Sequence, residues 1–100
     1  MHNMVYLIGR LTKDVEIEEN GAIINVAVQR ASKNEEGIYE TDFFDVKLGQ
    51  IATNTAEYCQ KGDLVGIKGV LRNGENGTYV LAEKITFLAS RKANEIEEEE

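Results

Sequence analysis

Residues 41–48 alternate strictly between two sets of side chains, which predicts a β-strand. With a period of two, one side of this strand carries Phe44, Val46 and Leu48. We expect that side to face a hydrophobic core. The opposite side, which we expect to face solvent, carries Phe43, Asp45 and Lys47.

Further alternating runs predict four more strands, over residues 4–11, 22–30, 63–72 and 78–88. The inward-facing positions of the second and third runs are expected to be Ile24, Val26, Val28, Val65, Ile67 and Leu71. Asn20-Gly21 predicts a tight hairpin turn, because both residues tolerate positive φ. It follows Val15 and Ile17, which continue an alternation after the first run. Gly9 inside that run predicts a bulge or a sharp bend.

The hydrophobic period changes between residues 50 and 61. Apolar and small residues return there at helical spacing, and Gly62 stands where a left-handed residue commonly closes a helix. A helix of about three turns is predicted. Cys59 is expected to pack inward from it as a small hydrophobic residue.

Three strands, a helix and two further strands thus follow one another along the chain. This order is typical of an all-β OB-fold, a five-stranded Greek-key barrel with one short helix between strands three and four. We predict a barrel domain over residues 1–89, followed by a short, acidic and flexible tail over residues 90–100.

The composition fits one globular domain, because 100 residues of which 42% are hydrophobic can build one modest core. No apolar run approaches the roughly 20 residues of a membrane span, and no signal-like leader opens the chain. We therefore expect a soluble, cytoplasmic protein without membrane contact. One cysteine (Cys59) and one histidine (His2) are too few for an internal disulfide or a protein-built zinc site, so we expect no metal and no cofactor.

The net charge of −7 is unevenly spread. Residues 95–100, Glu-Ile-Glu-Glu-Glu-Glu, carry five of the 18 acidic groups, which leaves 13 acidic against 11 basic residues. The body of the chain is therefore nearly balanced, and its lysines and arginines can still gather on one face.

An exposed ring beside a cation gives the strand over residues 41–48 a candidate chemistry. Phe43 and Lys47 share its solvent-facing side, where an exposed ring usually has a reason. Single-stranded nucleic acids bind surfaces of this kind, since bases stack on rings and phosphates attract cations. The alternative is a phenylalanine packed under a loop or against another subunit.

Residues 5–14, Val-Tyr-Leu-Ile-Gly-Arg-Leu-Thr-Lys-Asp, resemble the opening strand of the bacterial and phage single-stranded DNA-binding proteins. Further motifs follow in that family's order, at close to its spacings: Asn20-Gly21, Val26-Ala27-Val28, Asp42-Phe43-Phe44, Ala56-Glu57-Tyr58, Lys61-Gly62 and Gly69-Val70-Leu71-Arg72. The resemblance covers about residues 3–89. It implies an OB barrel that binds and protects single-stranded DNA without regard to sequence, in replication, recombination or repair.

The resemblance also implies roles for individual residues. Phe43 matches the family's aromatic residue that stacks on a base, and Lys61 and Arg72 match basic positions. Together with exposed rings and cations from the strand patterns, the predicted nucleic-acid-binding residues are Phe43, Lys47, Lys33, Lys61, Lys68, Arg72, Tyr39 and Tyr79.

A second apolar row is predicted on the first strand. Met4, Tyr6 and Ile8 would share one exposed side, which monomers seldom tolerate. We expect this row to join copies of the chain into a closed homo-oligomer, a tetramer by resemblance and a dimer as second choice.

Two alternatives to simple strand binding stay open. A small OB-fold accessory, like primosomal replication protein N, would bind a replication protein as well as single-stranded DNA; the short length and the absence of tryptophan favour it. An enzyme is the other alternative. The sequence offers no Ser, His and Asp set and no phosphate-cradling glycine loop, so we expect no catalytic residues.

Overall fold

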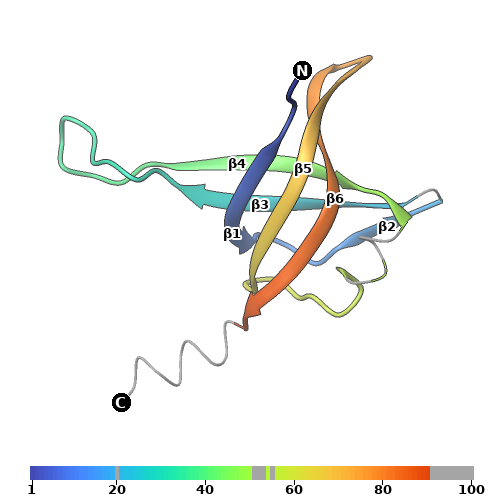
Figure 1. The fold of residues 1–100 in the computed structure, drawn as a ribbon. Helices are drawn as coiled ribbons and strands as arrows, with labels where there is room; N and C mark the ends of the chain where they lie inside the picture. The colour runs from blue at the N-terminus through green and yellow to red at the C-terminus, as the bar shows by residue number, and fades with distance from the viewer. Residues whose placement is uncertain (20, 51–53, 55, 91–100) are drawn as a thin grey trace.

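Six strands form one sheet that closes on itself (Figure 1). The computed structural model describes residues 1–19, 21–50, 54 and 56–90. Its strands are β1 (Val5–Leu11), β2 (Glu16–Glu18), β3 (Gly21–Gln29), β4 (Thr41–Leu48), β5 (Leu64–Gly74) and β6 (Gly77–Ala89). β1 pairs with both β5 and β3, and β4 pairs with β6 in parallel. The five long strands therefore form the closed ring β1-β5-β6-β4-β3.

The predicted all-β OB barrel is confirmed by this ring. The structure adds the short strand β2, which pairs with β3 along the edge that β1 also uses. This pairing places Glu18 opposite Gly21. Half of the predicted Asn20-Gly21 turn, Asn20, lies outside the described residues, and Gly21 is the first residue of β3.

Gly9 lies where the barrel closes. A Cβ at this position would stand 2.3 Å from the Ala27 carbonyl oxygen and 2.7 Å from Val26 Cγ1. The sequence predicted a bulge or a sharp bend at Gly9; β1 pairs with β5 through this residue without a shift of register, so the bulge is wrong. The glycine instead permits a close approach of β1 to β3.

Buried apolar side chains from all five long strands fill the barrel. The largest of them that are fully buried are Leu11, Ile24, Val26, Val46, Val65 and Ile67. β6 adds Val80, Ala82 and Ile85. Alternation therefore predicted the core correctly at Ile24, Val26, Val46, Leu48, Val65 and Ile67.

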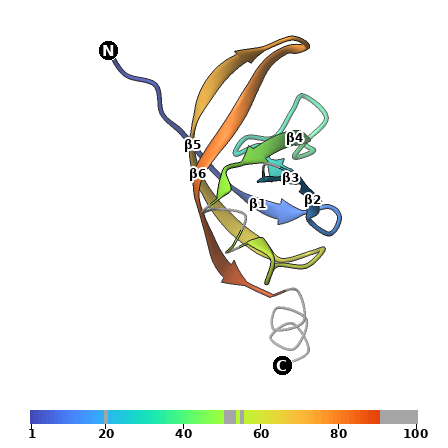
Figure 2. The ribbon, with the colours of Figure 1, turned by 90° about the vertical axis from the view of Figure 1, so that its right-hand side faces the viewer.

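Two hairpins extend beyond the barrel, and there the inward predictions fail (Figures 1 and 2). One is the β5–β6 hairpin; the other is the β3–β4 arm, residues 29–42. Leu71, predicted to face inward, is 47% exposed, because β5 has passed the end of the core at that residue. Phe44, next to the arm, is 37% exposed, although its register partner Val26 on β3 is fully buried.

The helix predicted over residues 50–61 falls partly on residues 51–53 and 55, which lie outside the described residues. Next to them, the Cys59 N–H donates to the Ala56 carbonyl at 2.9 Å, and the Asp63 N–H donates to the Gln60 carbonyl at 3.0 Å. Cys59 is buried, as predicted. Most of the predicted tail, residues 91–100, also lies outside the described residues.

Candidate nucleic-acid interface

The solvent-facing side of β4 carries the residues that alternation predicted. Phe43 is 64% exposed, and Asp45 and Lys47 are exposed beside it, whereas Val46 and Leu48 are buried. The assignment of the two faces of β4 is therefore confirmed except at Phe44, which was predicted to face the core but is 37% exposed. A ring with most of its surface in water is available to a stacking partner.

The parallel pairing of β4 with β6 brings Lys47 to Tyr79. Lys47 Nζ lies 4.4 Å from the centroid of the Tyr79 ring, a cation–π contact. Tyr79 stands directly opposite Arg72 of β5, so these side chains share a face. We call Phe43, Lys47, Tyr79 and Arg72 the β4–β6–β5 surface.

A shallow hollow adjoins this surface. It is lined by Lys47 and Tyr79 together with the turn between β5 and β6, residues 74–78. The hollow places exposed backbone next to a ring and a cation, which suits an extended polar chain better than a compact ligand.

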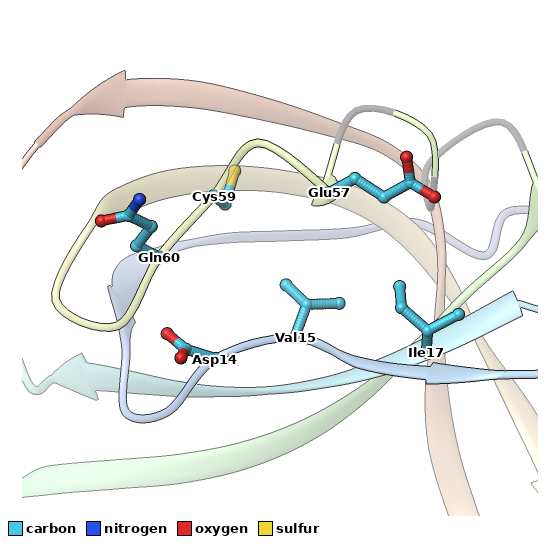
Figure 3. Close-up of a pocket in the computed structure, with 6 residues that line it drawn as sticks. All are labelled: Asp14, Val15, Ile17, Glu57, Cys59 and Gln60. Atoms are coloured by element: carbon cyan, nitrogen blue, oxygen red, sulfur yellow. The ribbon is translucent and has the colours of Figure 1, made fainter.

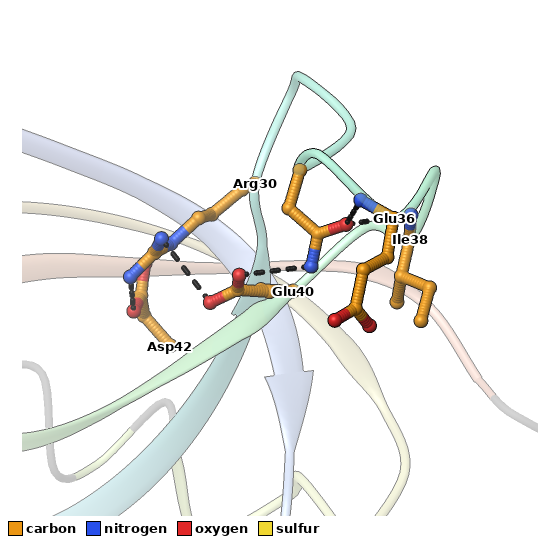
Figure 4. Close-up of polar contacts among 6 residues, drawn as sticks. Arg30, Glu36, Ile38, Glu40 and Asp42 are labelled. Carbon is orange, nitrogen blue, oxygen red and sulfur yellow. Dashed lines mark hydrogen bonds and ion pairs between the residues drawn. The ribbon is translucent and has the colours of Figure 1, made fainter.

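The β3–β4 arm carries a second ring and cation. Lys33 Nζ lies 5.6 Å from the centroid of the Tyr39 ring. The tip of the arm is shaped by Asn34, whose Oδ1 accepts hydrogen bonds from the backbone N–H groups of Glu36 and Ile38 (Figure 4). Tyr39 therefore lies in the loop before β4, within reach of a strand that continues past Phe43.

Arg30 holds the base of the arm together, and the sequence patterns gave no indication of this role. Its guanidinium donates from Nε and Nη2 to the two carboxylate oxygens of Asp42, each at 3.0 Å, and forms an ion pair with Glu40 at 3.3 Å (Figure 4). The hydrogen bonds from Arg30 lower the pKa of Asp42, and those to Asp42 raise the pKa of Arg30. The pairing of Arg30 with Asp42 could have been predicted from the hairpin register, which places residues 30 and 42 near each other across the arm.

We expect the ion pair between Arg30 and Asp42 to persist at pH values below the ordinary pKa of an aspartate. A carboxyl whose pKa is lowered in the folded state loses its contribution to stability only as the pH falls through that lowered pKa. The Arg30 Nε–H signal, followed by NMR, should therefore persist in mildly acidic solution. Asp42→Asn should move or broaden that signal at neutral pH, whereas Glu36→Gln on the same arm should leave it in place. A signal that is unaffected by Asp42→Asn would contradict the pairing.

Lys61 and Lys68, two of the predicted binding residues, lie away from Phe43. Lys61 is on the turn before β5, where its backbone N–H donates to Asp14 Oδ1 at 2.9 Å. Lys68 stands on β5 opposite Tyr6 of β1 and Lys84 of β6. The structure therefore groups Arg72 with Lys47 through Tyr79, and groups Lys68 with the apolar row of β1.

That row is exposed on the outer side of β1. Met4, Tyr6 and Ile8 are 61%, 66% and 63% exposed, as predicted. A groove runs across the neighbouring strands at this place, and it is lined by Tyr6, Leu7, Ile8, Gly66, Ile67, Lys68, Lys84, Thr86 and Leu88. We call this the β1–β5–β6 face.

A smaller hollow lies beside Cys59, between the turn before β5 and the segment around β2 (Figure 3). Burial, followed by the negative charge of Asp63, raises the pKa of the Cys59 thiol. The thiol is therefore protonated near neutral pH and fits the packing role predicted for it.

No three His, Cys, Asp or Glu side chains are grouped to hold a metal ion in the part of the chain that the structure describes. Residues 1–19, 21–50, 54 and 56–90 also contain no helix that is both long and apolar enough to span a membrane.

Solved structures share this fold. The small single-stranded DNA-binding protein from Streptomyces coelicolor superimposes with a TM-score of 0.65 at 23% identity, over 88% of this chain and 95% of that chain. A deletion mutant of the single-stranded DNA binding protein from Thermus aquaticus gives a TM-score of 0.64 at 29% identity, over 90% of this chain and 52% of that chain.

Sequence comparison agrees with the fold. The chain is 39% identical over 103 residues to Single-stranded DNA-binding protein B of Bacillus subtilis, a match that covers 88% of this chain and 91% of the relative. It is 40% identical to the Single-stranded DNA-binding protein of Bacillus cereus, of which it spans 62%. The model of the single-strand binding protein family matches residues 2–88, nearly the whole barrel. The chain therefore belongs to the single-strand binding protein family.

Proposed function

We propose that this protein binds single-stranded DNA with little regard to sequence and protects it during replication, recombination or repair. The observation that carries the proposal is the β4–β6–β5 surface, where two rings and two cations from three adjoining strands form one outer face. Membership of the family and the names of the relatives support the same function. Such a protein would act in the cytoplasm of a bacterial cell, where the DNA lies.

The mechanism follows from what an unpaired strand exposes. A base without a partner offers its flat face to Phe43, while Lys47 and Arg72 neutralise phosphates and release counterions. In a duplex the base faces are already stacked on one another, so the ring gains nothing. Lys33 and Tyr39 on the arm would extend the contact along the strand.

Strand binding is favoured over the primosomal accessory, because the relatives are named for single-stranded DNA binding. We propose no catalytic activity. Replication or repair proteins remain proposed partners in addition to DNA.

Titration of fluorescently labelled oligo-dT tests this function. We expect tight binding at low salt that weakens steeply as salt is added, because each phosphate contact releases counterions. Duplex DNA of the same length should bind much more weakly, and single-stranded RNA serves as a third ligand. Equal affinity for duplex, or no binding to oligo-dT at low salt, would remove the proposal.

We further propose that the β1–β5–β6 face joins copies of the chain. Its apolar residues line a groove on an outer sheet face, and exposed apolar patches of this kind usually mark contacts between proteins. A closed arrangement would cover the face in every copy, and we expect a tetramer, with a dimer as the second choice.

Ile8→Asp is expected to dissociate this oligomer to monomers at micromolar concentration, since it buries an unpaired charge in the contact. Light scattering coupled to gel filtration measures the mass. Ile38→Asp, at a similarly exposed isoleucine on the arm, is the matched control and should keep the wild-type mass. A wild-type protein that is already monomeric would contradict the proposed contact.

We propose that the acidic residues 95–100 compete with DNA for the β4–β6–β5 surface. A tethered polyanion is present at a high effective concentration near its own molecule. Deleting them should tighten binding to oligo-dT by about twofold to fivefold at low salt, and the gain should fade as salt screens the charges. A variant with glutamine at all five glutamate positions keeps the length and should behave like the deletion. If both variants bind as the wild type does at low salt, the segment is not a competitor.

A further inference from the structure

The solvent-facing side of β4 places a carboxylate between the two residues proposed to contact DNA. Asp45 lies two residues from Phe43 and two from Lys47 on the same face, about 7 Å from each along the strand. A negative charge at this place lies on the proposed path of a polyanion. The Asp45 carboxylate would repel a phosphate, so we expect its partner to be another group of the DNA.

Asp45 is held by a row of hydrogen bonds that crosses from the end of β1 to β4. Asn25, its register partner on β3, donates from Nδ2 to Asp45 Oδ1 at 2.9 Å. The Thr12 hydroxyl lies 2.7 Å from Asn25 Oδ1, to which it donates. Because this bond fixes the orientation of the Asn25 amide, the amide N–H is aimed at Asp45 and the carboxylate has a defined direction.

The second oxygen of this carboxylate is unused. Asp45 Oδ2 receives no hydrogen bond from any residue that the structure describes, and Asp45 forms no ion pair with those residues. Asp42, on the same strand, differs because both of its oxygens are occupied by Arg30. Asp45 is thus an oriented acceptor that stands next to an exposed ring.

We propose that Asp45 accepts a hydrogen bond from the exocyclic amino group of the base that stacks on Phe43, an inference that rests on the proposed DNA-binding function. Cytosine carries such a donor, N4–H₂, where thymine and uracil carry the acceptor O4. A carboxylate attracts the first group and repels the second. Asp45 is therefore a specificity-determining residue that biases a sequence-tolerant surface toward bases with an exocyclic amino group, such as cytosine, and away from thymine and uracil.

A simpler role for Asp45 would be repulsion of the phosphates alone. That role predicts that removal of the charge tightens binding to every sequence by the same factor. A hydrogen bond to the base predicts a change that depends on the base. The two roles can therefore be separated by comparing strands that differ only in the group at the 4-position of the base.

Titrations of oligo-dC and oligo-dU of equal length, at mildly alkaline pH, make this comparison. We expect the wild-type protein to favour dC over dU by about threefold to tenfold more than Asp45→Asn or Asp45→Ala does. The wild-type ratio should hold as salt is raised, although both affinities fall. Asp45→Asn keeps an acceptor for Asn25, so it should fold normally even if Asp45→Ala does not, and thermal unfolding checks both variants.

Glu57→Gln is the control, because it removes one exposed negative charge from the turn before β5 and should leave the ratio unchanged. If both Asp45 variants change the affinities for dC and dU by one common factor, Asp45 acts only as a repelling charge and the inference is overturned. If the wild-type protein binds neither strand at low salt, the proposed function itself fails. These two failures are distinguished by the wild-type titration alone.

Discussion

Phe43→Ala is expected to weaken binding to oligo-dT by about 1 to 3 kcal/mol, or roughly 5-fold to 150-fold in Kd, with little loss of stability. The ring is 64% exposed, so its removal leaves no cavity in the core, yet it takes away the proposed stacking platform. The Kd from a fluorescence titration and the Tm of the same preparation measure the two effects. Phe43→Trp should retain binding, because indole also stacks.

Phe44→Ala is the matched control, since it removes the same ring from the next residue on the other side of β4. Phe44 is 37% exposed, less than Phe43, and shares its side of β4 with the buried Val46 and Leu48, so this variant should lower the Tm more and the affinity less. If Phe43→Ala instead unfolds the protein while binding per folded molecule is unchanged, Phe43 has a structural role and the proposed surface is wrong.

Gly9→Ala should destabilise the barrel strongly, although it adds only one methyl group where β1 meets β3. The new Cβ would stand 2.3 Å from a backbone oxygen of Ala27, and a backbone atom in a paired strand cannot move aside as a flexible side chain can. We expect the free energy of unfolding to fall by about 3 kcal/mol or more, and the Tm therefore to drop by at least about 10 °C.

Thermal unfolding followed by circular dichroism measures that loss. Gly49→Ala is the control, because a Cβ at Gly49 meets nothing within 4 Å. A Gly9→Ala variant with the Tm of the wild type would show that β1 and β3 are not packed as closely as the structure has them.

The strand pattern was sufficient to predict the barrel, because alternation reports directly which side chains a strand buries. It predicted Val46 and Leu48 as core and Phe43 as exposed. It failed at Leu71, since alternation continues after a strand has left the barrel and carries no information on where the core ends. The strand β2 was missed as a separate element, because three residues are too few to establish a period.

The grouping of the charged residues could not be predicted, because it depends on strand order. Lys68 and Arg72 lie on one strand, and only the positions of β1 and β6 beside it separate Lys68, next to Tyr6, from Arg72, next to Tyr79. The contact of Lys47 with Tyr79 likewise requires the parallel pairing of β4 with β6, which joins segments far apart in sequence.

Chemical-shift mapping tests the central claim that DNA binds the β4–β6–β5 surface. The backbone amide signals of uniformly ¹⁵N-labelled protein would be followed during titration with oligo-dT. The largest changes are predicted at Phe43, Lys47, Arg72 and Tyr79, with further changes on the arm near Lys33 and Tyr39. Changes concentrated instead at Tyr6, Ile8 and Lys68, with β4 unaffected, would place the DNA on the β1–β5–β6 face and contradict the account.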